Sequence, residues 1–330
     1  MDIIEKIALS LAIIVLGILV GKVLSRLSQG KWSGSVVTVE KWLNGMTMIA
    51  LLALGPLILI GVFWIVDIRQ MNLYYLPIIG ILCLVLGGLF AIGFAKVLKL
   101  DRKRTGSMFV SGTFYNWGSF GMLFCFMILG QQSLVYVVMV RIFEELIYYT
   151  IAFPMAKAYG IKQQEDQGQK LARIRILADP FILTALLAIL IGGILNFSPL
   201  GRPGLYEMFI NIVVPLSILL LIIPIGYRMQ FMAVQDYLKE SFSISIVRFI
   251  MVPICIIPLA YGLGLGNLHD GMVLRTILIL SAMPPAFMSL IPPKLYGLDV
   301  NLAMSGFKQT MGIIGKIIIT SRNHNMIVVY

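Results

Sequence analysis

Two short stretches place glycine, proline and polar residues inside otherwise apolar segments. The first is Ser111-Gly-Thr-Phe-Tyr-Asn-Trp-Gly-Ser-Phe-Gly121, and the second is Ser281-Ala-Met-Pro-Pro-Ala-Phe-Met-Ser289. Glycine is a poor helix former, and each proline removes a backbone donor and clashes with the carbonyl one turn earlier. Both stretches therefore predict interrupted helices. The helix ends that an interruption frees carry unpaired N–H groups and partial positive charge, which suit an anion.

We expect these interruptions to line a binding site. The candidate substrate-binding residues are Tyr115, Asn116, Trp117, Gly118, Ser119, Ser281, Pro284 and Pro285. Asn116 and Ser119 have the side chains that cap helix N-termini. The alternative is that the prolines only kink a packed helix, while Asn116 bonds to a neighbouring helix.

A third candidate group is the charged set Arg141, Glu144 and Glu145 within the apolar segment 133–157. Ionisable residues inside membrane segments are costly, so each is a functional hypothesis. Arg141 can pair with either glutamate at a spacing of three or four. The other carboxylate could then carry a proton. Alternatively, the group is an internal neutral pair that only stabilises the bundle.

Two residues of the last apolar segment, Lys308 and Gln309, are expected to face the same cavity. Arg248 and Arg275 begin other apolar segments, and we expect both to be mostly structural. His269 and His324 lie far apart in the chain. We therefore predict no metal site, no cofactor and no catalytic residues.

The composition identifies the kind of protein that carries these groups. Of the 330 residues, 59% are hydrophobic and 12% are charged, whereas soluble domains have about 45–50% and about 25%. This composition excludes a soluble enzyme, a disordered chain and a secreted disulfide scaffold, and it predicts a polytopic membrane protein. The net charge of +11 fits basic cytoplasmic loops better than nucleic-acid binding.

Ten apolar segments of membrane-spanning length can be marked. They are residues 7–25, 43–66, 74–98, 107–129, 133–157, 180–198, 205–227, 243–264, 271–293 and 299–320. Lys and Arg concentrate in the loops that follow the odd-numbered segments. The positive-inside bias therefore predicts a multi-pass protein of the cell membrane, with both termini extracytoplasmic.

The longest hydrophilic stretch divides the ten segments into five and five. We expect a first five-helix repeat at 1–159, a cytoplasmic linker at 160–178, a second repeat at 179–320 and a short extracytoplasmic tail at 321–330. Because five is odd, the two repeats would be inverted in the membrane. The two interrupted segments are the fourth of each repeat, which is the arrangement that indicates a carrier's binding site near the midplane.

Several of these motifs resemble the auxin efflux carriers and their bacterial permease relatives, within the bile, arsenite and riboflavin transporter superfamily. The resemblance covers about residues 7–320. It is most specific in Met283-Pro-Pro-Ala-Phe-Met-Ser-Leu, in Tyr296-Gly-Leu-Asp299 and in Asn116-Trp-Gly-Ser-Phe-Gly121. One departure is Leu123, near which the family usually has a proline.

The resemblance implies an all-α membrane fold of two inverted five-helix repeats, with broken helices four and nine crossing at mid-membrane. It also implies a scaffold of spans 1, 2, 6 and 7 and a mobile unit of spans 3–5 and 8–10, which is an elevator arrangement. Family substrates are organic anions, including indole acetic acid in plants and dicarboxylates in some bacteria. By the same resemblance, Tyr149 joins Glu144 and Glu145 as polar contacts supplied by the fifth span.

These observations favour a secondary transporter of a small organic anion that is coupled to protons or driven by the membrane potential. No GxxxxGK[ST] motif for ATP is present. A sodium-coupled carrier of the bile-acid symporter type is the first alternative, and a membrane enzyme or a non-transporting sensor is the second. The expected partners are the anion, a proton or sodium, and the bilayer; a homodimer stays open.

Overall fold

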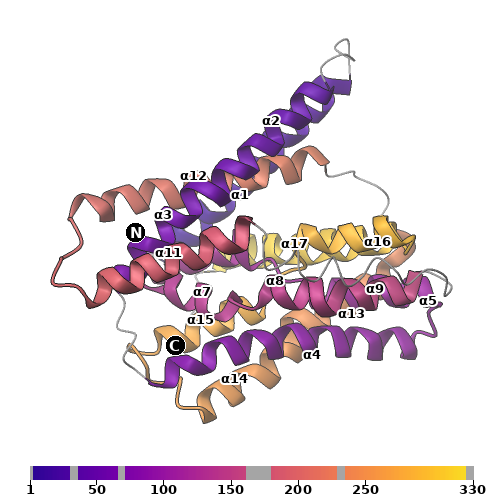
Figure 1. Cartoon of the computed structure of the whole chain (residues 1–330). Helices are drawn as coiled ribbons and strands as arrows, with labels where there is room; N and C mark the ends of the chain where they lie inside the picture. Colours follow the sequence, from indigo (N-terminus) through magenta and orange to yellow (C-terminus); the bar gives the residue numbers. More distant parts are fainter. Residues whose placement is uncertain (1–2, 30–35, 66–70, 161–179, 229–234, 325–330) are drawn as a thin grey trace. The chain divides into compact units, whose positions relative to one another are not determined.

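The computed structural model describes residues 3–29, 36–65, 71–160, 180–228 and 235–324 (Figure 1). Within these ranges the chain is helical apart from short connections and one isolated backbone bridge. A helix, or a run of consecutive helices, lies over each of the ten apolar segments. The all-α prediction is therefore confirmed for the described residues.

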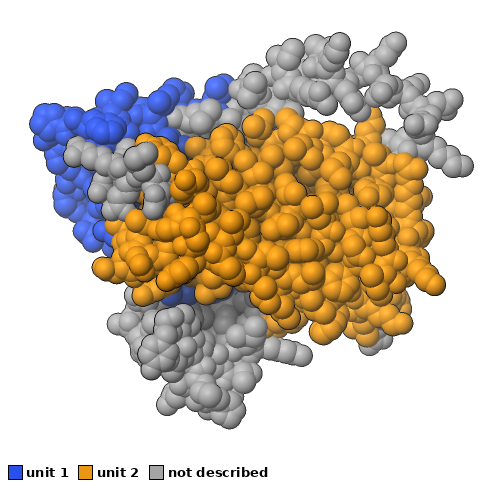
Figure 2. Space-filling view, turned by 90° about the horizontal axis from the view of Figure 1, so that it is seen from below, with its two compact units in different colours: residues 1–67, 122–135, 177–231 blue, residues 68–121, 136–176, 232–330 orange. Residues whose placement is uncertain are grey.

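The chain divides into two compact units, coloured separately in Figure 2. Unit 1 comprises Met1–Asp67, Met122–Val135 and Leu177–Phe231. Its helices are α1 (Ile3–Gln29), α2 (Val36–Ile49), η2 (Ala50–Leu54), α3 (Gly55–Ile65), α6 (Met122–Leu129), α11 (Pro180–Phe197) and α12 (Leu205–Arg228). Helix α7 (Ser133–Arg141) begins in unit 1 and continues in unit 2.

Unit 2 comprises Ile68–Gly121, Tyr136–Ile176 and Met232–Tyr330. Its first helices are η3 (Met71–Tyr75), α4 (Leu76–Val97), α5 (Arg102–Thr113), η4 (Trp117–Gly121), α8 (Glu144–Ile147), η5 (Tyr148–Ala152) and α9 (Phe153–Gly160). They are followed by η6 (Gln235–Tyr237), α13 (Leu238–Ile246), η7 (Val247–Met251), α14 (Val252–Gly262), α15 (Met272–Ser281), η8 (Phe287–Leu290), α16 (Ile291–Tyr296) and α17 (Val300–His324).

In the part of the chain that the structure describes, four helical stretches are long and apolar enough to cross a bilayer: Thr38–Ile65, Leu73–Val97, Leu205–Pro224 and Leu238–Gly262. About 20 apolar residues are needed to span the hydrocarbon core. Large aliphatic side chains point outward from these and other helices, as Leu89, Leu190, Ile194 and Ile254 do. Extensive apolar surface of this kind is rare on soluble monomers and indicates a membrane environment. The protein is therefore a helical membrane protein.

Unit 1 is held together by close helix contacts and by a few polar anchors. A methyl group on Gly21 of α1 would lie 2.2 Å from the carbonyl oxygen of Ile223 on α12. Only glycine allows these two backbones to approach so closely. The amide nitrogen of Asn196 donates to the carbonyls of Phe63 (3.1 Å) and Trp64 (3.0 Å), which joins α11 to the end of α3.

Unit 2 contains a reciprocal glycine contact between α4 and α5. A methyl group on Gly87 would lie 2.1 Å from the Gly112 carbonyl oxygen, and one on Gly112 would lie 2.3 Å from the Gly87 oxygen. These helices can pack backbone against backbone only because both residues are glycine. The contact fixes the last turn of α5, directly before the first helix interruption.

Two predicted segments, the linker at 160–178 and the tail at 321–330, lie mostly outside the residues that the structure describes. The predicted linker 160–178 lies outside the described residues except for Gly160, which ends α9. Helix α17 extends to His324 and thus runs into the segment expected as a short tail from residue 321.

Candidate functional site at a helix crossing

The two predicted interruptions are present as breaks in the helices of unit 2. Helix α5 ends at Thr113 and η4 starts at Trp117, while α15 ends at Ser281 and η8 starts at Phe287. The two connections pair as a short antiparallel bridge centred on Tyr115 and Pro285. The Asn116 N–H donates to the Pro284 carbonyl (3.0 Å), and the Ala286 N–H donates to the Phe114 carbonyl (2.9 Å).

Local sequence explains why the pairing takes this form. Pro284 and Pro285 have no N–H groups, so neither can donate a backbone hydrogen bond. The connection pairs through the Pro284 carbonyl and the Ala286 N–H. At the other connection, Phe114 still closes the last turn of α5 by donating to Val110 (3.0 Å). The crossing therefore satisfies backbone groups that a helix break would leave unpaired.

Asn116 organises the turn that follows the first break. Its side-chain oxygen accepts from the Ser119 hydroxyl and from the Phe120 N–H (3.4 Å), and its backbone oxygen accepts from the Gly121 N–H (2.9 Å). Asn116 is 4% exposed, and its side-chain nitrogen has no described partner. Ser119 is thus engaged with Asn116, while the amide of Asn116 retains a buried donor.

Trp117 joins the two breaks through its side chain. The indole nitrogen donates to the Leu280 carbonyl in the last turn of α15 (2.8 Å), and the ring stacks on Tyr115 with centroids 5.0 Å apart. The Ser281 hydroxyl donates to Leu278 of its own helix (2.9 Å). Ser281 therefore lies at the break, but in this state its hydroxyl serves its own helix.

A series of hydrogen bonds leads from Arg141 to Tyr115 at the crossing. The Arg141 Nε donates to Glu144 (2.8 Å), and the Tyr148 hydroxyl donates to the other Glu144 oxygen (3.0 Å). The same hydroxyl accepts from the Tyr115 N–H (2.7 Å). Arg141 also lies beside Gly118, where a methyl group would be 2.9 Å from the guanidinium.

Arg141 pairs with Glu144, one of its two expected partners, and Glu144 is 4% exposed. The side chains of Glu145 and Tyr149 lie outside the described residues. Lys308 and Gln309 are half-buried, beside Phe307, whose ring centroid is 6.4 Å from that of Phe287 in the second break.

Arg248, which the sequence suggested as mostly structural, lies at the crossing. It is fully buried in η7 and donates from Nη2 to the carbonyls of Ser111 (2.7 Å) and Phe114 (2.6 Å). Its Nε also donates to Ser111 (3.2 Å), and its guanidinium carbon lies 3.6 Å from the Tyr115 ring centre. No sequence signal connects Arg248 to this break, because the contact joins segments more than 130 residues apart.

Three π-helical turns of unit 2 supply residues of this cluster. Trp117 belongs to η4, Tyr148 to η5 and Arg248 to η7. Such turns are rare, and they occur frequently at functional sites. A π-helical turn is wider than an α-helical turn and changes the direction of the side chains that follow it. Three such turns around one crossing indicate a site of specific shape.

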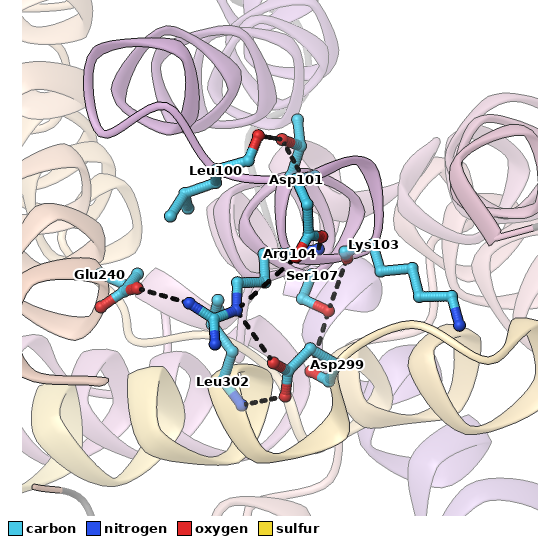
Figure 3. A network of polar contacts seen from close by, with 9 residues as sticks. Leu100, Asp101, Lys103, Arg104, Ser107, Glu240, Asp299 and Leu302 are labelled. Atoms are coloured by element: carbon cyan, nitrogen blue, oxygen red, sulfur yellow. Dashed lines mark hydrogen bonds and ion pairs between the residues drawn. The ribbon is translucent and has the colours of Figure 1, made fainter. Parts of the chain in front are cut away.

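The N-terminal end of α5, which lies away from the helix break, is anchored by a separate polar network (Figure 3). Arg104 lies between Glu240 of α13 (3.9 Å) and Asp299 before α17 (3.6 Å). The Ser107 hydroxyl donates to the Asp299 backbone oxygen (2.8 Å). Nearby, partial burial and the charge of Asp299 raise the pKa of Tyr237, so its phenol is neutral at physiological pH. This network fixes α5 relative to α13 and α17 within unit 2.

No protein-family model matches the chain, and no curated protein matches it.

Proposed function

We propose that this protein is a secondary transporter of a small organic anion, a mono- or dicarboxylate, that works by alternating access. The observation that carries the proposal is the backbone pairing of two helix breaks at Tyr115 and Pro285. In a membrane protein, non-helical backbone is tolerated only where protein surrounds it or where it lines a watery cavity. Paired breaks are also the best sequence pointer to a carrier's substrate site.

The polar groups of the crossing suit an anion. Asn116 keeps a buried donor, and Arg248 places a positive charge beside Tyr115. The buried carboxylate of Glu144 is already paired with Arg141, so it would repel an incoming anion less than a free carboxylate would. These features support a site that takes up a carboxylate rather than a cation.

The grouping of the chain into units supports an elevator mechanism. Unit 1 contains the first, second, sixth and seventh predicted spans, which correspond to the proposed scaffold, together with residues 122–135. Unit 2 contains the third, fifth, eighth, ninth and tenth spans and the first half of the fourth. We propose that the ten spans form two inverted repeats in the cell membrane, with both termini extracytoplasmic, as in the auxin efflux carriers.

Coupling to protons, or transport driven by the membrane potential, fits the site better than coupling to sodium. A sodium ion needs several oxygen ligands, preferably including a free carboxylate. The buried carboxylate that the structure describes here, Glu144, accepts hydrogen bonds from Arg141 and Tyr148. A guanidinium in direct contact with Glu144 would repel sodium, whereas protonation of the carboxylate would release Arg141.

The test is a thermal-shift screen of the purified chain against acetate, malonate and succinate, at two pH values, with and without sodium. A ligand that binds only the folded state raises the apparent stability with the logarithm of its concentration over Kd. We expect at least one carboxylate to stabilise the protein without sodium, and more strongly at the lower pH.

Each other outcome counts against a defined part of the proposal. Stabilisation that requires sodium would favour the bile-acid symporter type. The absence of any carboxylate effect would contradict the substrate class. Chemical turnover of an added compound by the purified protein would favour a membrane enzyme.

A further inference from the structure

Among the side chains that the structure describes, the buried charges around the crossing do not balance. Arg141 and Glu144 form an ion pair at 2.8 Å and neutralise each other. Arg248 is fully buried and forms no ion pair with any carboxylate that the structure describes. Burying a charge is expensive unless it is paired and hydrogen-bonded. One buried positive charge therefore lacks a counter-charge within the described part of unit 2.

The contacts of Arg248 compensate this charge only in part. Its acceptors are backbone carbonyls in the last turn of α5, where the helix dipole contributes about half a negative charge. A guanidinium has five N–H donors. Three hydrogen bonds, from Nε and Nη2, go to Ser111 and Phe114. The remaining nitrogen, Nη1, is buried and donates to no described protein atom.

The connection that follows α5 carries two further polar side chains, Tyr115, whose ring lies against the Arg248 guanidinium, and Asn116, the next residue. The buried Tyr115 hydroxyl interacts with the Arg248 guanidinium, and the buried side-chain nitrogen of Asn116 has no partner among the described residues. Both belong to the connection whose first residue, Phe114, is held by Arg248. Buried polar groups in native proteins are nearly always hydrogen-bonded. The unpaired nitrogens of Arg248 and Asn116 and the hydroxyl of Tyr115 are hydrogen-bond donors at one helix break, and such donors can bind an anionic oxygen.

We propose that Arg248 binds the carboxylate of the transported anion through Nη1, with Asn116 and Tyr115 as neutral hydrogen-bond donors. This inference rests on the proposed function, which it deepens by naming the residue that selects a negative charge. Because Arg248 also holds the carbonyls of Ser111 and Phe114, an anion at Nη1 is bound directly to the first helix break. A purely structural role, in which Arg248 only caps α5, predicts a different result.

The experiment compares the full-length wild-type protein with Arg248→Gln, Arg248→Lys and the control Arg275→Gln. Arg275 lies on α15 of the same unit and is exposed, so its replacement removes the same charge away from the crossing. Apparent Kd values are taken from the thermal stabilisation by acetate, malonate and succinate. Succinamide, which has the size of succinate but no charge, is the ligand control.

We expect a carboxylate, but not succinamide, to stabilise the wild type. Arg248→Gln should weaken carboxylate binding about tenfold to a hundredfold, which is the effect of losing a charged hydrogen bond. Arg248→Lys should weaken it less, and Arg275→Gln should leave Kd unchanged within about twofold. A structural role would instead lower the melting temperature of the free Arg248 variants and leave Kd as in the wild type.

Wild-type carboxylate affinity in Arg248→Gln would overturn the inference while leaving the proposed function intact. If Arg248→Gln does not fold, Arg248→Lys decides: an unchanged Kd overturns the inference, and a several-fold weaker one supports it. If the wild type binds none of the three carboxylates, the proposed function and this inference fail together.

Discussion

Replacing Gly87 with alanine tests the helix contact that positions the first break. The new methyl group would lie 2.1 Å from the Gly112 carbonyl oxygen, well inside the 3.0 Å below which such contacts are essentially never found. The obstacle is backbone, so no side chain can rotate away. Helices α4 and α5 must separate, and Gly112 lies only three residues before Tyr115 at the crossing.

We expect Gly87→Ala to lower the free energy of unfolding by about 1–3 kcal/mol, which is the usual effect of overpacking a tight interior. For a domain the size of unit 2, each kcal/mol corresponds to about 2–4 °C in melting temperature. Gly93→Ala on the same helix is the matched control, because a methyl group there would meet nothing within 4 Å. Alanine is the better helix former by up to about 1 kcal/mol, so the control should be neutral or slightly stabilising.

The assay is thermal unfolding of the two purified variants in the same detergent, followed by carboxylate binding. We expect Gly87→Ala to melt roughly 3–10 °C below Gly93→Ala and to bind carboxylates more weakly. Equal melting temperatures would refute the reasoning, because they would mean that α4 and α5 do not meet at Gly87 and Gly112.

Two further substitutions probe the crossing itself. Trp117→Phe removes the indole hydrogen bond to the Leu280 carbonyl, which keeps only the longer bond from the Met283 N–H (3.3 Å), so we expect a loss of about 0.5–1.5 kcal/mol in thermal or denaturant unfolding; unchanged stability would contradict that contact. Glu144→Gln removes the carboxylate that pairs with Arg141 at 2.8 Å and should cost about 1–3 kcal/mol, less than for a fully buried pair because Arg141 is partly exposed. The same variant should flatten the pH dependence of transport, and a wild-type pH profile would exclude Glu144 as the proton carrier.

Much of the fold could be predicted because apolar composition and proline chemistry act locally. Segment 205–227 was expected as a span and forms α12 (Leu205–Arg228). The break at Pro284 and Pro285 followed from missing donors, and the break near Asn116 followed from helix-disfavouring residues. These features depend on a few neighbouring residues, so the sequence alone contains the necessary information.

The composition of the site depended on contacts that no local pattern encodes. Spacing allowed Arg141 to pair with either glutamate, and only three-dimensional packing brings Glu144 to both Arg141 and Tyr148. Arg248 looked structural because it stands at the start of an apolar segment. Its role at the crossing depends on η7 packing against the end of α5, and the π-helical turn that contains it has no recognised sequence signature.

The most direct test of the central claim is uptake of radiolabelled acetate, malonate and succinate into liposomes that contain the purified protein. We predict saturable uptake of at least one of them by the wild type and by Gly93→Ala. Asn116→Ala should incorporate normally but lose uptake, because it removes the buried donor at the crossing. Wild-type uptake by Asn116→Ala would contradict a substrate site at the crossing, and no uptake by the wild type would contradict a carboxylate transporter.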